Sequence, residues 1–126
     1  MKIERFEDIK AWHEARKLVN MVYEAINGSN CFSHDYRLVN QMQAAAVSSM
    51  SNIAEGFSRK VNKEFVQFLF ISKSSAAEVQ SQLYVALDQK YIDTETFEKI
   101  YAQVETVSKM NSGLIKYLCK TLNSPK

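Results

Sequence analysis

Residues 41–59 read QMQAAAVSSMSNIAEGFSR, and this stretch decides the fold. Its middle consists almost entirely of small side chains, and it closes on Asn-Ile-Ala-Glu-Gly. Small residues at successive turns of a helix let a neighbouring helix come close, but they do no chemistry themselves. The stretch therefore predicts a tightly packed helix and says little about activity.

The composition is that of one soluble globular domain. Of the 126 residues, 46% are hydrophobic and 24% are charged, which is ordinary for such proteins. Three Gly and one Pro are few, and this favours long helices. No apolar run approaches the roughly 20 residues of a membrane span. We expect a cytoplasmic protein with one domain over residues 1–126 and a disordered tail at about 123–126.

Apolar residues at helical spacing predict two helices in the first half of the chain. The first covers about residues 7–26 and is broken by the polar run NGSN at 27–30. The second starts near Asp35, with Ser33 as another candidate N-cap. Gly56 marks its expected end or C-cap.

Two further helices are predicted in the second half. One starts at Asn62, its expected cap, and runs to about Lys90; the other starts at Asp93 or Thr94. Similar lengths and short connections favour antiparallel neighbours. The predicted fold is therefore all-α, an antiparallel up-down-up-down four-helix bundle.

The register between the second and third helices follows from the turn that joins them. A turn about residue 59 or 60 places the small residues 44–46 opposite 72–75. The same register places Gln41 opposite Glu78, as a buried or half-buried hydrogen-bonded pair. Two small-residue patches would then meet in mid-bundle, and these helices would lie unusually close.

The third predicted helix carries more apolar surface than one bundle can cover. Residues 65–71 are apolar nearly all round the helix. A second stripe lies off the main seam and consists of Val66, Phe70, Ala77 and Tyr84. Because exposed apolar stripes mark interaction sites, we expect a neighbouring subunit to cover this one. Scattered surface aromatic residues are the alternative interpretation.

Charge is distributed unevenly along the predicted bundle. The basic end is the end with the N-terminus, the 56–62 connection and the C-terminus; it has nine basic against five acidic residues. The opposite, acidic end has three basic against eight acidic residues. Part of this asymmetry matches helix dipoles. The rest favours phosphate contacts by Arg59, Lys60, Lys63, Lys116 and Lys120.

The sequence offers little for catalysis. Neither His13 nor His34 has a Glu three residues before it, so the Glu-x-x-His pattern of di-iron bundles is missing. Cys31 and His34 supply only two of the four ligands of a structural zinc site. No glycine-rich phosphate loop is present. We expect no enzymatic activity, no cofactor and no metal.

Several motifs together resemble one known protein family. Phe6 with residues 9–12, IKAW, is similar to its opening Phe-x-x-Leu-x-x-Trp motif. The motif residues of the later helices are Gln41, Ala45, Ser48, Asn52, Glu55, Gly56, Arg59, Phe65, Ser75 and Glu78. The chain thus resembles the bacterial four-helix bundle proteins encoded in intervening sequences of large-subunit ribosomal RNA genes. The accessory variability determinant of diversity-generating retroelements is similar to the same family.

This resemblance implies a ring-shaped homopentamer with no established catalytic activity. The retroelement relatives act as nucleic-acid-associated partners of a reverse transcriptase. This chain departs from the family at Ala44, where Arg is common, at Met50, where Pro is common, and at Ser74, where Gly is usual. The missing Arg would have been placed near Glu78, so no role of that patch is carried over.

Two functions from different classes are expected. The leading one is a non-enzymatic oligomer that associates with RNA or DNA through its basic end. The alternative is a structural adaptor whose ring binds another protein, with the acidic end as docking surface. An enzyme of unknown type is a third, weaker reading. For Asn52 and Glu55 we expect mainly a structural role, satisfying backbone groups where the second helix ends.

Overall fold

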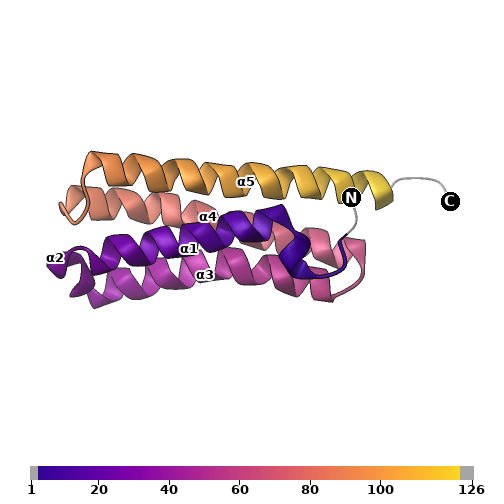
Figure 1. The fold of residues 1–126 in the computed structure, drawn as a ribbon, viewed down its shortest axis with the longest axis horizontal. Helices are drawn as coiled ribbons and strands as arrows, with labels where there is room; N and C mark the ends of the chain where they lie inside the picture. The colour runs from indigo at the N-terminus through magenta and orange to yellow at the C-terminus, as the bar shows by residue number, and fades with distance from the viewer. Residues whose placement is uncertain (1–2, 123–126) are drawn as a thin grey trace.

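The computed structural model describes residues 3–122, and helices are the only regular secondary structure in that range. Four long helices lie side by side (Figure 1). Their bounds are α1 (Lys10–Asn27), α3 (Tyr36–Ser58), α4 (Asn62–Asp88) and α5 (Thr94–Leu122). A 3-10 turn, η1 (Phe6–Asp8), precedes α1, and a single turn, α2 (Asn30–Ser33), lies between α1 and α3. The predicted tail at 123–126 lies outside the described residues.

The helices enclose one hydrophobic core. α3 packs against α1 and α4, and α5 packs against α4 and α1. η1, the α3–α4 turn and the last turns of α5 lie at one end of the molecule, which is the basic end, while α2 and the α4–α5 turn lie at the other (Figure 1). No helix of the described chain is long and apolar enough to cross a membrane.

The first long helix begins at Lys10, so the predicted start at Glu7 is wrong. The Asp8 carboxylate accepts hydrogen bonds from the backbone N–H groups of Glu4 and Arg5, at 3.0 and 3.2 Å, and closes η1. Ile9 is then extended, with φ −86° and ψ 115°. The amphipathic pattern runs through this break because the side chain of Ile9 is still buried.

Side-chain caps fix two of the other helix starts as predicted. The Asp35 carboxylate accepts from the Leu38 N–H at 3.2 Å, and the Asp93 carboxylate accepts from the Thr96 N–H at 2.8 Å. α4 differs, because Asn62 is its first helical residue and Val61, which has no capping side chain, is its N-cap. The predicted Asn62 cap is therefore wrong.

Gly56 does not end its helix. α3 continues through it to Ser58, so the predicted C-cap at Gly56 is wrong. A Cβ atom added to Gly56 would lie 2.7 Å from the Cβ of Phe68 and 2.9 Å from the Cδ1 of Phe65. The missing side chain thus makes room for α4 near the basic end.

The α3–α4 register is shifted from the predicted one. The hydroxyls of Ser48 and Ser75 are 2.8 Å apart, and the Ser72 hydroxyl donates to the Ser49 carbonyl at 2.6 Å. Residues 48 and 49 therefore lie opposite 72–75, about one turn from the predicted 44–46. The shift arises because α3 extends to Ser58, which moves the turn toward Lys60 and Val61.

Gln41 and Glu78 are both exposed in this register, so the predicted buried or half-buried pair is wrong. The main seam of α4 faces the core, and each of its members is buried: Phe65, Leu69, Ser72, Ala76, Val79, Leu83 and Ala86.

Candidate nucleic-acid interface

The five basic residues predicted to contact phosphates lie on two segments of the basic end. Arg59 and Lys60 form the α3–α4 turn, and Lys63 lies in the first turn of α4. Lys116 and Lys120 lie toward the end of α5, which reaches the same end of the molecule (Figure 1). All five side chains are exposed, so the fold places these charges together on one end.

Arg59 is held in place by two contacts. Its guanidinium forms an i, i+4 ion pair with Glu55 at 2.9 Å and lies over the Phe68 ring at 5.0 Å. An exposed ion pair of this kind contributes about 0.2–1 kcal/mol to stability. The contacts orient Arg59 along the turn, but Glu55 offsets part of its charge.

Lys60 has an unusual backbone conformation. Its φ is +60°, in the left-handed region that favours glycine, and its N–H donates to the Phe57 carbonyl at 3.3 Å. A non-glycine residue in this region carries a cost of order 1 kcal/mol. Lys60 also lines a pocket beside this turn.

This pocket, which we call the Tyr117 pocket, has a volume of about 400 Å³. It brings together the N-terminal segment, the α3–α4 turn and α5, and its lining residues are Ile3, Phe57, Lys60, Val61, Asn62, Phe65, Tyr117 and Leu118. The Phe57 and Phe65 rings meet edge to face at 6.1 Å. Sequence reasoning missed Tyr117; the available signal was an aromatic residue directly after Lys116 and three before Lys120.

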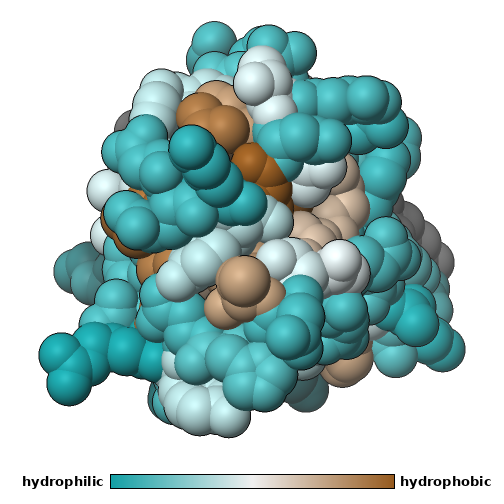
Figure 2. Space-filling model, turned by 90° about the vertical axis from the view of Figure 1, so that its left-hand side faces the viewer, coloured by the Kyte–Doolittle hydropathy of each residue, from teal (hydrophilic) through white to brown (hydrophobic). Residues whose placement is uncertain are grey.

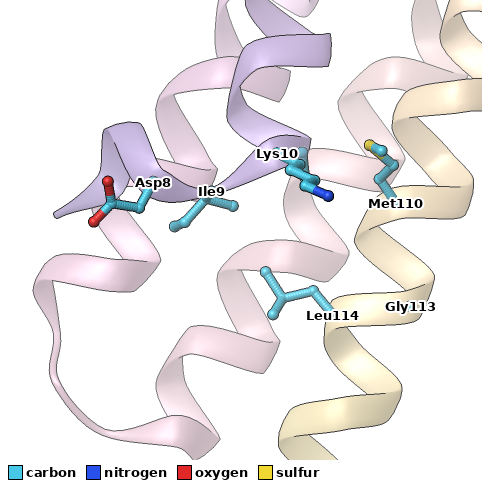
Figure 3. Close-up of a pocket in the computed structure, with 7 residues that line it drawn as sticks. Asp8, Ile9, Lys10, Met110, Gly113 and Leu114 are labelled. Atoms are coloured by element: carbon cyan, nitrogen blue, oxygen red, sulfur yellow. The ribbon is translucent and has the colours of Figure 1, made fainter. Parts of the chain in front are cut away.

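A second pocket of about 490 Å³ lies between the start of α1 and α5. Figure 3 shows Lys10 extending toward Met110, while the Asp8 carboxylate points away from α5. Gly113 opens the α5 side, because a Cβ added there meets no atom within 4 Å. One basic and one acidic residue line this pocket, so it adds no net charge to the basic end.

The family motif on α3 and α4 is built into the helix pair. The Asn52 amide donates to the carbonyl and the hydroxyl of Ser48, at 2.8 and 2.9 Å, and Ser48 in turn meets Ser75. Asn52 thus satisfies a carbonyl within the helix and not at its end, where we expected it to act. Glu55 forms the ion pair with Arg59, and Gly56 packs against Phe68. These motif residues therefore stabilise the α3–α4 pair.

The apolar stripe on α4 is largely exposed. Phe70 and Tyr84 are 53% and 51% exposed, and Ala77 is exposed between them. Val66 is only half-buried and packs against the core, so it serves the bundle as well. The Tyr84 ring also contacts Phe97 of α5 edge to face, at 4.9 Å.

Hydrophilic residues cover most of the acidic end, which faces the viewer in Figure 2. The Thr96 N–H bonded to Asp93 lowers the pKa of that carboxyl. Lys99 forms an ion pair with Glu95 at 3.1 Å. Tyr91 donates its hydroxyl hydrogen to Asp35 at 2.9 Å, and this bond raises the pKa of Tyr91.

Within the described residues, no three His, Cys, Asp or Glu side chains gather in a way that could hold a metal ion. Cys31 and His34 lie in and beside α2, at the acidic end. The Nδ1 atom of His34 lies 2.7 Å from the Asn30 carbonyl oxygen, and this contact caps the short helix α2.

Comparison with known proteins identifies a family and solved structures of similar fold. A protein of unknown function from the S23 ribosomal protein family of Bacteroides thetaiotaomicron is similar in fold, with a TM-score of 0.70 and 22% identity. The match covers 85% of this chain and 92% of that one. A comparison with curated protein sequences finds no match. The sequence model of the 23S rRNA-intervening sequence protein family matches residues 7–113. Since this match covers most of the chain, the protein belongs to the 23S rRNA-intervening sequence protein family.

Proposed function

We infer that the chain is an antiparallel up-down-up-down four-helix bundle that assembles into a homopentameric ring and associates with RNA or DNA in the bacterial cytoplasm. It catalyses no reaction in this proposal. The observation that carries it is the placement of five exposed basic residues on one end of the bundle: Arg59, Lys60, Lys63, Lys116 and Lys120.

The charge at the basic end favours phosphate over neutral ligands. Lys and Arg side chains that neutralise phosphates release condensed counterions, and this release drives sequence-independent binding. Phosphate contacts position a protein without reading base sequence. The net charge of the whole chain is only +2, so one copy alone gives weak binding, and strength depends on several copies acting together.

Ring formation is supported by the exposed stripe on α4. Phe70 and Tyr84 present large apolar rings to solvent, with Ile71 and Val85 exposed beside them at 47% and 45%. The resemblance to the family implies five copies. In a ring whose subunits stand parallel, five basic ends point to one face, which concentrates positive potential there.

Fluorescence anisotropy with labelled single-stranded and duplex 20-mers tests the nucleic-acid part of the proposal. The variant Arg59→Gln/Lys60→Gly/Lys63→Gln should weaken binding to all sequences about equally. It should also flatten the salt dependence, because each lost phosphate contact lowers the slope by about 0.7–0.9. Glycine at residue 60 removes the lysine side chain with its charge and adopts the left-handed backbone without strain.

The acidic end offers a closely matched control. Lys90 also has a left-handed φ, of +65°, and Lys99 is paired to a Glu as Arg59 is. The variant Arg37→Gln/Lys90→Gly/Lys99→Gln therefore removes three positive charges with similar structural consequences and should leave binding nearly unchanged. Equal losses in both variants, or no binding by the natural protein at low salt, would overturn the proposal.

The adaptor function is the second candidate. It is supported by two shallow grooves at the acidic end, of about 260 and 290 Å³, which share Glu24, Ala25 and Thr96 in their linings. Substitution of Glu24, which lines both grooves, by Gln should then weaken binding of a basic partner protein while nucleic-acid binding stays unchanged.

A further inference from the structure

We propose that the Tyr117 pocket binds an unpaired base of a single nucleic-acid strand, with Tyr117 as the stacking surface and the surrounding lysines on the flanking phosphates. This inference rests on the proposed function and narrows it, since it separates single strands from duplexes. It assigns a role to Tyr117 and Asn62, which the phosphate contacts alone leave unexplained.

The lining of the pocket suits a planar, mostly apolar group. Tyr117 and Val61 both line the pocket and are 46% and 50% exposed, so part of each side chain is open to solvent. The Phe57 and Phe65 rings, which contact each other edge to face, add two aromatic groups to the lining, and Phe65 is buried while Phe57 is half-buried. A volume of about 400 Å³ is within the roughly 300–1,000 Å³ of small-ligand sites.

The polar members of the lining fit the edges of a base. Asn62 is half-buried and carries both a donor and an acceptor on its amide, so it can pair with a Watson–Crick or Hoogsteen edge. Lys60 adds a positive charge to the lining. A lipid chain or an apolar peptide would leave both of these groups without a matching partner.

The charge around the mouth matches a phosphate backbone. Lys63 directly follows the lining residue Asn62 in the first turn of α4, and Lys116 and Lys120 flank Tyr117 on α5. Val61 gives the first turn of α4 no side-chain cap, so the positive end of that helix dipole adds to the same field. Glu64 and Glu4 are the acidic residues nearest in sequence to the lining, and the basic residues outnumber them.

An aromatic side chain amid lysines distinguishes single-strand sites from duplex sites. In a duplex the bases are stacked on each other and cannot enter a pocket, whereas unpaired bases stack on exposed aromatic rings. Lysines alone would bind both forms. Tyr117 therefore gives the basic end a preference for single strands that its charge does not supply.

Anisotropy measurements with a uridine 12-mer and a duplex of equal length test this inference. Base–aromatic stacking is worth about 1–3 kcal/mol, so Tyr117→Ala should weaken single-strand binding about 5- to 150-fold. Tyr117→Phe should stay within about twofold, because it keeps the ring. Duplex affinity and the salt slope should be unchanged in both variants, since no charge is lost. Tyr36→Ala, which removes an exposed tyrosine at the acidic end, should bind like the natural protein.

A photo-crosslink locates the base directly. A strand carrying one 5-iodouridine should form its adduct on Tyr117, identified by mass spectrometry of the digested full-length protein. An adduct confined to another residue, or equal loss of single-strand and duplex binding in Tyr117→Ala, would refute base binding in the Tyr117 pocket. Neither result would contradict the proposed phosphate contacts. No binding of either nucleic acid by the natural protein would overturn the proposed function itself.

Discussion

The α-carbon of Gly56 faces the side chain of Phe68, and a Cβ atom on Gly56 would lie only 2.7 Å from the Cβ of Phe68. Real Cβ contacts essentially never reach this distance. α3 and α4 therefore approach each other here more closely than they could if residue 56 carried a Cβ atom. The same Phe68 ring receives the guanidinium of Arg59, so the close approach also helps to set the α3–α4 turn.

Gly56→Ala should destabilise the protein by about 0.5–2 kcal/mol. Overpacking costs about 1–3 kcal/mol, and the better helix propensity of Ala offsets roughly 0.5–1 kcal/mol of it. Urea unfolding followed by circular dichroism gives the free energy of unfolding. Gly113→Ala is the matched control, because Gly113 is also within a helix but has open space, and it should stabilise by about 0.4–1 kcal/mol. If both substitutions stabilise, the helices are not in close contact at Gly56.

A buried hydrogen-bond chain joins α5 to α3 through α4. The Asn111 amide donates to the Ser72 hydroxyl at 2.9 Å, and that hydroxyl donates to the Ser49 carbonyl at 2.6 Å. Asn111 and Ser72 are both fully buried, and the Asn111 side-chain oxygen accepts no hydrogen bond from the residues that the structure describes. The hydrogen-bond chain therefore already contains one buried oxygen without a donor among those residues. Loss of a further hydrogen bond in it should cost stability.

Ser72→Ala should cost about 1–3 kcal/mol, because it leaves the Asn111 amide buried without an acceptor. In an Asn111→Ala background the same substitution should cost less, since the stranded amide is gone. The double-mutant cycle should give a coupling of about 0.5–3 kcal/mol in the free energy of unfolding. Additive costs would show that the two side chains do not depend on each other.

The sequence predicted the helices and their buried seams because apolar spacing records which face meets the core. It predicted the wrong role for Gly56, because glycine at a helix end and glycine under a neighbouring helix look the same in one chain. The register error has a related cause: Ser72 and Ser75 fit opposite alanines or serines equally well. Only the length of the α3–α4 turn, which periodicity does not define, decides between these two arrangements.

The candidate site was predictable in its charges and not in its pocket. Basic residues stay exposed wherever the fold places them, so counting them by bundle end was sufficient. The Tyr117 pocket needs Phe57, Lys60 and Tyr117 to converge from α3, the turn and α5. Convergence of this kind depends on how far each helix extends, and the sequence reading ended α3 at Gly56, two residues short.

Removal of the Tyr91 hydroxyl should have a pH-dependent effect. Tyr91 donates to Asp35 and its pKa is raised by this bond, while its ring stacks on Phe32 at 5.2 Å. The folded state thus holds this proton more tightly than the unfolded state. The resulting stability is fully present below the unfolded pKa of about 10 and is lost as pH rises through the folded value.

Tyr91→Phe keeps the stacked ring and removes the hydroxyl. Urea midpoints of this variant and of the natural protein should differ at pH 7–9 and converge above pH 10. Both proteins carry the other tyrosines, so titration of those residues cancels in the comparison. A difference that stays constant up to pH 11 would mean that the Asp35 bond does not hold the proton.

The final prediction concerns assembly. Phe70→Glu and Tyr84→Glu place charges in the middle of the exposed α4 stripe, where burial against a second subunit would carry a large desolvation cost. Because both rings are about half-exposed in the single chain, neither substitution should unfold the bundle, and helical content should be largely kept. Sedimentation equilibrium at micromolar concentration should show the pentamer for the natural protein and monomers for both variants.

Tyr36→Glu, at a residue 66% exposed and located at the acidic end, should leave the pentamer intact. A natural protein that sediments as a stable monomer would refute the ring, and with it the five-fold concentration of basic charge on which strong phosphate binding depends.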